Sequence, residues 1–370
     1  MAAYTLFGVE CSYYAAKIRA NLAYKRVPYE EIQASRKIYA EEILPRVGWP
    51  VVPVLVTPEG GAVQDTSEMF DLLEARHSEP AALPPDGAGR VLSYLLEFLG
   101  DEWLKLPAMH FRWNHNYDFI VEEFGRNNDP ELPRERQIEI GRKIAPRFHG
   151  WLPSLGITAE SIPFLESDYL IFLALFDAHL ATSPYLLGAA PTLGDFAFYG
   201  PLYAHLFRDP ASGAIMAEHA PRVVDWILRL QPGAPDAEPL AAETVLTPTL
   251  AALLVHMLRD FVPITVAAMA ELQHWLATNP GADELPRLVG EHRVTFGRGT
   301  LVALDVTRAV FPYEQWMLQR VQDCCATLHG EARAQAEALL GQIGAKPLVG
   351  IPLERRVERR NYRLYRAGAA

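Results

Sequence analysis

Ser12 stands where a short apolar run gives way to a helical pattern, in the segment Val9-Glu-Cys-Ser-Tyr-Tyr. A serine in this position most often only caps the helix. The same position also places its hydroxyl beside free backbone N–H groups and the positive end of the helix dipole, which together stabilise an anion. We interpret Ser12 as a hydrogen-bond donor to a sulfur anion. Cys11, directly before it, is the alternative reactive group.

A proline interrupts an apolar run at residues 51–56, which otherwise has the pattern of a buried strand. Because proline removes one donor from a strand ladder, Pro53 predicts an edge, a bulge or a cis peptide bond. A cis bond between Val52 and Pro53 would expose the backbone N–H and C=O of Val52. Both groups would then be free to pair with an extended peptide ligand.

Three polar residues, Gln64, Asp65 and Thr66, precede another helical pattern. The simpler interpretation is that Thr66 caps this helix. The functional interpretation is a clamp for an α-amino acid. In that clamp, Thr66 and the free N–H groups bind a carboxylate, and Asp65 or Gln64 binds an ammonium group.

The elements that must position these residues form a small α/β unit. Strands are predicted at residues 4–7, 27–32, 51–56 and 62–64, with helical patterns between and after them. One helix places Ile18 and Leu22 on its inner face, and the last one Met69, Leu72 and Leu73. The order βαβα followed by ββα predicts a mixed sheet.

Beyond a loop-rich linker at 78–87 the periodic segments are helical. They are predicted at 91–98, 134–144, 164–180, 195–207 and 221–230, before a second linker at 231–239. The third region is predicted to contain helices at 248–261, 264–277, 313–328 and 331–343, an irregular stretch at 293–310 and an arginine-rich tail. The fold class is therefore an α/β domain, an all-α domain and a mainly helical C-terminal extension.

Taken in this order, the motifs resemble the glutathione transferase superfamily. The strand, Ser12 at the head of a helix ending Lys-x-Arg, the Val-Pro-Val-Leu run and the Asp-Thr before a helix are similar to its thioredoxin-like domain. The segments Pro184-Tyr-Leu-Leu-Gly, Pro191-Thr-Leu-Gly-Asp and Pro221-Arg-Val-Val-Asp-Trp are similar to its all-α domain, where Thr192 and Asp195 form a structural helix cap. The resemblance covers about residues 3–230.

This resemblance implies a thioredoxin-like domain at 1–80, an all-α domain at 88–230 and an extension at 243–370 outside the family architecture. It implies that Ser12 keeps the glutathione sulfur ionised for transfer to a small hydrophobic electrophile, a detoxification chemistry, in a homodimer. Val52 and Pro53 would face the tripeptide backbone, and Gln64, Asp65 and Thr66 would hold its γ-glutamyl end. Met109, His110 and Trp113, on the helix that starts the all-α domain, are candidates to line the electrophile site or to pack the domain interface.

Two alternatives stay open. Tyr13 stands where many relatives have proline, and a register shift of one residue would make Cys11 the centre of a thiol–disulfide oxidoreductase or deglutathionylase. The second alternative is a non-catalytic protein that uses the fold for protein contacts.

Composition excludes several other classes. The chain has 34 Lys and Arg against 45 Asp and Glu, a net charge of −11, which argues against nucleic-acid binding. Its 3 cysteines, with Cys324 and Cys325 expected to be buried and inert, favour a reducing compartment. We expect no signal peptide, no membrane span and a cytoplasmic location.

Two histidines and the C-terminal tail complete the set of polar features in the sequence. His110 and His115 are five residues apart and do not share a helical face, so we expect no metal site. The tail at 353–366 contains six arginines, and in an acidic chain we expect it to dock on the protein's own surface.

Overall fold

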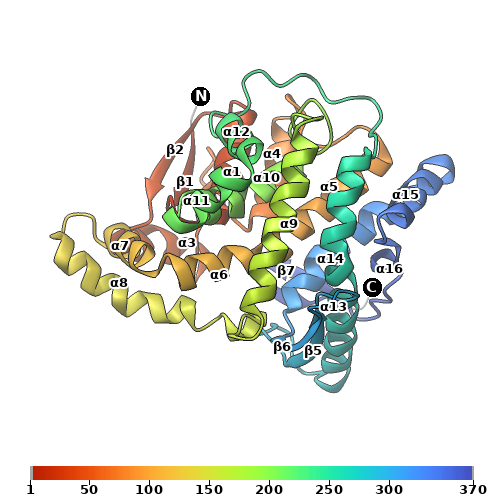
Figure 1. The fold of residues 1–370 in the computed structure, drawn as a ribbon. Coiled ribbons are helices and arrows are strands. Elements are labelled where there is room, and N and C mark those ends of the chain that lie inside the picture. The colour runs from red at the N-terminus through yellow and green to blue at the C-terminus, as the bar shows by residue number, and fades with distance from the viewer. Residues whose placement is uncertain (1–2, 369–370) are drawn as a thin grey trace.

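The first domain is built on a four-stranded mixed sheet in the order β2-β1-β3-β4. Strands β1 and β2 are labelled in Figure 1. This computed structural model describes residues 3–368. The strands are β1 (Tyr4–Gly8), β2 (Tyr29–Gln33), β3 (Val54–Val56) and β4 (Ala62–Gln64). Strand β1 pairs with β2 in parallel and with β3 antiparallel, and β3 pairs with β4 antiparallel. The predicted mixed sheet is therefore confirmed.

Helices α1 (Tyr13–Tyr24) and α4 (Thr66–Arg76) supply the apolar side chains that cover the sheet. Ile18 and Leu22 of α1 and Met69 and Leu73 of α4 are fully buried in one cluster with strand residues. Between β2 and β3 lie the short turns α2 (Arg36–Ile38), η1 (Tyr39–Ile43) and α3 (Leu44–Val47). The i, i+4 pairs predicted from the sequence therefore lie on the inner faces of both helices, but Leu72, also predicted to face inward, is only half-buried.

Strand β3 is shorter than the apolar run that predicted it. Only residues 54–56 pair with β1, and Val51, Val52 and Pro53 precede the ladder. Proline has no N–H to donate, so pairing begins after it. The Val52–Pro53 peptide bond is cis.

The second domain is all-helical and follows the linker as predicted. Its elements are α5 (Gly87–Phe98), η2 (Leu99–Trp103), α6 (Lys105–His115), α7 (Tyr117–Asn128), α8 (Arg134–His149), η3 (Pro153–Leu155), α9 (Ile162–Leu180), α10 (Leu193–Pro201), η4 (Leu202–Phe207), α11 (Pro210–His219) and α12 (Pro221–Leu230). Helices α7 and α8 form a hairpin that extends to one side of the molecule (Figure 1).

Two glycines allow the α7–α8 hairpin to close. A Cβ on Gly125 would lie 1.7 Å from the carbonyl oxygen of Gln137, and one on Gly141 would lie 1.8 Å from that of Val121. Backbone therefore packs directly on backbone where the helices cross, which only glycine permits.

The extension contains one long helix where the sequence predicted two. Helix α13 (Pro248–Thr278) continues through Pro263. Its apolar face is buried against the second domain, where the ring of Phe261 lies 4.7 Å from that of Phe98 and 5.8 Å from that of Trp103. This burial outweighs the local disruption that a proline causes.

Within residues 3–368, α13 is also the one helix long and apolar enough to cross a membrane by length and composition. Of its most apolar 18-residue window, 56% is buried inside the protein. Helices in protein cores are buried in this way, so α13 is only weak evidence for a membrane span.

The rest of the extension is less helical than predicted. The stretch expected to be irregular is a hairpin of β5 (Glu291–Phe296) and β6 (Leu304–Ala309), and the arginine-rich tail is a second hairpin of β7 (Val357–Arg360) and β8 (Arg363–Arg366). Helices α14 (Pro312–Ala326), α15 (Gly330–Gln342) and α16 (Lys346–Val349) lie between them. The extension remains mainly helical. The prediction of a wholly irregular stretch was wrong because alternating residues such as Val294, Phe296 and Val306 bury one face of the hairpin.

Candidate functional site

Ser12 is the N-cap of α1, as the sequence predicts. Its Oγ accepts the backbone N–H of Ala15 at 3.3 Å, and the side chain is half-buried. Within residues 3–368 the hydroxyl proton of Ser12 meets no acceptor. The arrangement therefore leaves one O–H donor free beside the positive end of a helix, where an anion is stabilised.

The backbone of Val52 lies next to the sheet without belonging to it. Its side chain is half-buried, and its N–H and C=O make no hydrogen bond within the described residues 3–368. These are the free groups that pairing with an extended peptide requires.

A second helix N-terminus is formed by the residues after β4. The cap of α4 is Asp65, one residue earlier than predicted, and its Oδ1 accepts the N–H of Ser67 at 2.9 Å. Asp65 adopts a φ of 97°, a conformation rare outside glycine, which marks a position that its surroundings hold in place. Thr66 is the first helical residue and is 4% exposed. In the part of the chain that the structure describes, its hydroxyl makes no hydrogen bond.

The extension covers this second helix N-terminus. Arg359 donates to the carbonyl oxygen of Gln64 at 3.0 Å and to its Oε1 at 2.8 Å, and lies 3.7 Å from Oδ2 of Asp65. The hydroxyl of Tyr313 donates to the same Oδ2 at 2.5 Å. The tail thus places a cation where the sequence predicted that Gln64 and Asp65 would bind an ammonium group.

A buried ionic cluster lies beneath the covered site. Lys17 contacts Glu97 at 2.8 Å and Asp101 at 2.6 Å, and Glu97 also accepts from Arg320 of α14 at 3.1 Å and from Ser67 at 2.8 Å. Burial, only partly offset by Lys17, raises the pKa of Asp101 to about 7. For Glu97, burial also opposes ionisation, but Arg320 and Lys17 outweigh it and lower the pKa to about 2. The cluster ties both domains to the extension.

Two segments of the chain match models of known protein families. Residues 6–81 match the model of the glutathione S-transferase N-terminal domain, and residues 171–231 match that of the C-terminal domain. The first two domains belong to the glutathione transferase superfamily. No curated protein sequence matches the chain.

Solved structures with this fold are distant in sequence. A glutathione S-transferase from Methylobacterium radiotolerans, in complex with glutathione sulfonate, is 23% identical, with a TM-score of 0.40; the match covers 66% of this chain and 98% of that one. The beta-etherase LigF from a Sphingobium species is 16% identical, with a TM-score of 0.45, and the match covers 68% and 98%. Each match leaves about a third of this chain uncovered.

The helix cap that the glutathione transferase resemblance predicts is present. Thr192 and Asp195 form a capping box at the start of α10. Asp195 also accepts the N–H of Leu186 at 2.9 Å and the indole N–H of Trp226 at 3.2 Å. Burial outweighs these bonds and raises the pKa of Asp195 to about 6. The cap is a structural element of the core.

Cys11 lies in a different environment from Ser12. Its side chain is 2% exposed, its Sγ accepts from the amide of Asn127 at 3.3 Å, and its carbonyl oxygen accepts from Arg112 at 2.7 Å. Burial raises the pKa of the thiol, and the charge of Arg112 only partly opposes this. A reactive cysteine of the glutathione transferase or oxidoreductase type needs access and a low pKa, and Cys11 has neither.

The three residues suggested for the electrophile site all lie on α6 but contact different neighbours. Trp113 is 3% exposed and packs between α7 and α8, with its ring 6.1 Å from Phe148 and 5.6 Å from Phe124. His110 is fully buried, and its Nε2 lies 3.1 Å from Glu166 of α9. Met109 is partly buried against the core. These Trp113 contacts lie within the all-α domain and not at the domain interface that the sequence suggested.

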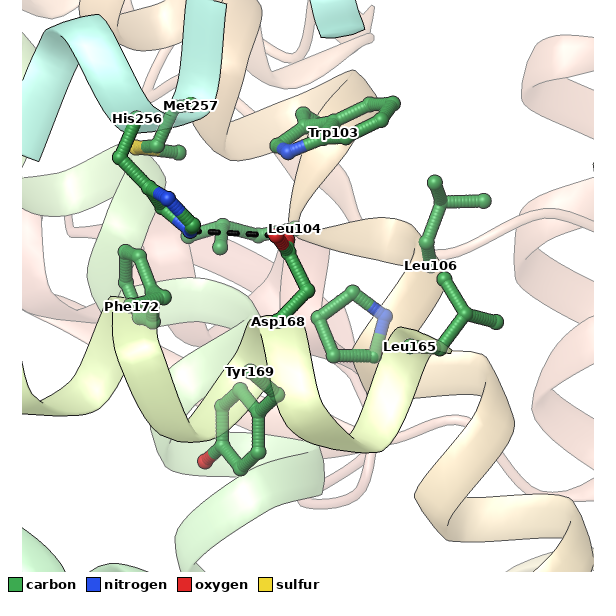
Figure 2. Close-up of a pocket in the computed structure, with 10 residues that line it drawn as sticks. Trp103, Leu104, Leu106, Leu165, Asp168, Tyr169, Phe172, His256 and Met257 are labelled. Atoms are coloured by element: carbon green, nitrogen blue, oxygen red, sulfur yellow. Dashed lines mark ion pairs between the residues drawn. The ribbon is translucent and has the colours of Figure 1, made fainter. Parts of the chain in front are cut away.

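The small cavity next to these helices is lined by other residues. It lies between η2, α6, α9 and α13, and Figure 2 shows His256 and Asp168 pointing toward one another across it, 3.3 Å apart. Its lining also includes Trp103 and Tyr169. Its volume of about 20 Å³ holds a water molecule and not an organic electrophile.

Tyr313 and Arg359 are the site residues that sequence reasoning missed. Nothing in their local pattern connects them with residues some 250 and 295 positions earlier. The one available signal was the excess of arginine in the tail, which led us to expect docking on the protein's own acidic surface. That expectation is confirmed, since Arg359 docks on Gln64 and Arg356 pairs with Asp323 at 2.6 Å.

Proposed function

We propose that this protein is a glutathione transferase-like enzyme in which Ser12 keeps the sulfur of glutathione ionised for transfer to a small hydrophobic electrophile. One observation carries the proposal: the Ser12 hydroxyl caps α1 through Ala15, while its own proton meets no acceptor among residues 3–368. Serine is not the nucleophile in this reaction. The sulfur of glutathione attacks, and Ser12 stabilises its anionic form.

The interaction free energies available from Ser12 and its helix are large enough to lower the thiol pKa of glutathione. A free thiol with a pKa of about 8.5 is only a few per cent thiolate at pH 7, and lowering the pKa by about two units requires about 2.7 kcal/mol. A hydrogen bond to an anion contributes about 1.5–3 kcal/mol. The helix N-terminus adds about 0.3–1 kcal/mol. Ser12 and α1 together therefore supply the required stabilisation.

The remaining groups suit the rest of the tripeptide. The free backbone of Val52 would pair with its peptide groups, and the Thr66 hydroxyl with the α4 N-terminus would bind the γ-glutamyl carboxylate. The α-ammonium group would take the place of Arg359 on Gln64 and Asp65. Glutathione binding then requires the β7–β8 hairpin to withdraw, so the described structure is a closed state of the enzyme.

The pKa of enzyme-bound glutathione tests this role directly. Thiolate absorbance of the complex, titrated against pH, should give a thiol pKa well below the free value for the wild-type chain and a higher one for Ser12→Ala. Ser35→Ala is the matched control, because Ser35 caps α2 with the same geometry, accepting the Ile38 N–H at 3.4 Å. An unchanged thiol pKa in Ser12→Ala, with glutathione bound, would refute the role.

A non-catalytic interaction protein is the second candidate. The observation in its favour is that Gln64 and Asp65 already have partners within the chain, Arg359 and Tyr313. Calorimetric titration with millimolar glutathione separates the two candidates. Binding by the wild type or by an Arg359→Ala variant supports the enzyme, and binding by neither supports the interaction protein.

By analogy with the superfamily we also propose a homodimer in the cytoplasm. Light scattering of the full chain should give twice the chain mass, and a monomer at micromolar concentration would contradict this.

A further inference from the structure

Three side chains of types that can bind a metal ion converge where α6 ends beside α9. Nε2 of His115 lies 2.8 Å from Oε1 of Glu166, and Nε2 of His110 lies 3.1 Å from the same oxygen. The three ligand atoms all lie within 4.8 Å of one another. Two imidazole nitrogens aimed at a single carboxylate oxygen form a compact donor set.

The fold builds this cluster despite a spacing that argues against it. The sequence predicted no metal site because residues five apart do not share a helical face. His115 is the last residue of α6, however, and both histidine rings pack on the buried ring of Phe111, at 4.8 and 5.3 Å. The third ligand, Glu166, comes from a different helix, α9, about 50 residues further along the chain. The spacing argument fails because tertiary packing supplies that ligand.

The donor set fits one group of cations. Zinc is bound by imidazole nitrogen at about 2.0–2.1 Å and by carboxylate oxygen at about 2.0–2.2 Å, and two histidines with one glutamate form a known type of open zinc site. Ligand atoms around a tetrahedral zinc are about 3.3 Å apart, given those bond lengths. The observed separations of 2.8 and 3.1 Å need to widen by only a few tenths of an ångström.

The exposure of the ligands leaves one side of the cluster open. His110 is fully buried, whereas the side chains of His115 and Glu166 are 42% and 39% exposed. A bound ion would therefore be held from the protein side by His110 and would face solvent on the other. The fourth position would be taken by water or by a small anionic ligand.

Asn114 is placed to orient the buried histidine. Its side-chain amide lies 2.8 Å from Nδ1 of His110. In the form described, the amide nitrogen donates to Nδ1, and the Nε2–H of His110 donates to Glu166. A metal at Nε2 requires the proton on Nδ1, and turning the amide by 180° gives that proton an acceptor, Oδ1 of Asn114. Asn114 can therefore supply the hydrogen bond to Nδ1 that orients a metal-binding histidine.

We propose that His110, His115 and Glu166 form a binding site for a divalent transition-metal ion, with zinc the best match to the donors. The site lies on α6 and α9, and none of its three ligands is among the residues proposed to bind glutathione. It is independent of the proposed function, and its failure would leave that function unaffected.

Titration of the tag-free, chelator-treated full chain with Zn²⁺ tests the site. Calorimetry should show one ion bound per chain, and Co²⁺ should give the visible absorption of a four- or five-coordinate site. Mg²⁺, which prefers six oxygen ligands, should not bind there. His115→Ala and Glu166→Gln should each weaken Zn²⁺ binding by at least about 10- to 100-fold. Loss of a residue that only supports a metal ligand already weakens metal binding by this much.

The variants are chosen so that folding does not confuse the result. His115 and Glu166 are both partly exposed, so their replacement leaves the core intact, and His219→Ala, at an exposed histidine of α11, is the matched control. The proposal is overturned if the wild type binds no Zn²⁺ at submillimolar concentration. It is equally overturned if His115→Ala and Glu166→Gln bind as tightly as the wild type and His219→Ala.

Discussion

The guanidinium group of Arg359 lies 2.8 Å from Oε1 of Gln64, and the two residues are 295 positions apart in the sequence. The Arg359 side chain is 6% exposed. Tyr362, in the turn of the same hairpin, donates its hydroxyl to the carbonyl oxygen of Ala62 at 3.2 Å. Because β4 is an edge strand, these two contacts cover backbone acceptors that would otherwise be unpaired. The hairpin therefore protects the edge and occupies the proposed γ-glutamyl site at once.

Replacement of Arg359 by alanine should strengthen glutathione binding. A hydrogen bond to a charged group contributes about 1.5–3 kcal/mol, so its loss should favour the open hairpin and raise the apparent affinity by about 10- to 100-fold. Calorimetry of the full-length variant measures this. Arg356→Ala is the control, because Arg356 pairs with Asp323 at the protein surface instead. Equal affinities for both variants and the wild type would contradict the closed-state interpretation.

Cys11→Ala should leave glutathione transfer unchanged. The thiol is buried and its pKa is raised by that burial, so it is protonated at neutral pH and inaccessible. A thiol-specific reagent should label Cys11 in the native chain far more slowly than in denaturant, with mass spectrometry locating the label. Loss of activity in Cys11→Ala together with fast native labelling would instead favour the oxidoreductase alternative.

The stability of the wild type should fall, relative to an Asp101→Asn variant, as pH rises from about 4 to about 7. Burial raises the pKa of Asp101 from 3.8 to about 7, so between these values the folded state binds the proton and the unfolded state does not. Deprotonation therefore favours unfolding across this range. Urea denaturation of both proteins at several pH values measures the difference. A difference that stays constant with pH would show that Asp101 ionises normally.

Gly125→Ala should destabilise the protein by about 1–3 kcal/mol or more, because the added methyl group meets the backbone of α8 and the helices must separate. Gly341→Ala is the matched control. Gly341 also lies inside a helix, α15, but a Cβ there meets no atom within 4 Å, so the change should be neutral or stabilising by about 0.5–1 kcal/mol. Thermal or urea denaturation compares the two. Equal effects would contradict the close backbone contact.

Local features of the sequence determined several elements of the first two domains, although α7 and α11 lie outside the helical segments predicted from it. The spacing of Ile18 and Leu22 defined the buried face of α1, Ser12 marked its first turn, and the Thr192 and Asp195 pair marked the start of α10. These features depend on contacts within one or two helical turns, so a single segment carries the information. One helix boundary was predicted one residue too late: the α4 cap is Asp65 and not Thr66, since the Asp65 carboxylate accepts the Ser67 N–H.

Only the tertiary structure decided which distant residues meet. Arg359 reached Gln64, and Glu166 joined His110 and His115, because packing of whole helices and hairpins brought these side chains together. Such pairings depend on the arrangement of elements separated by tens to hundreds of residues, and no local spacing encodes it. The sequence by itself determined where a thiolate-stabilising serine stands, and the folded chain decided that its own tail covers the neighbouring site.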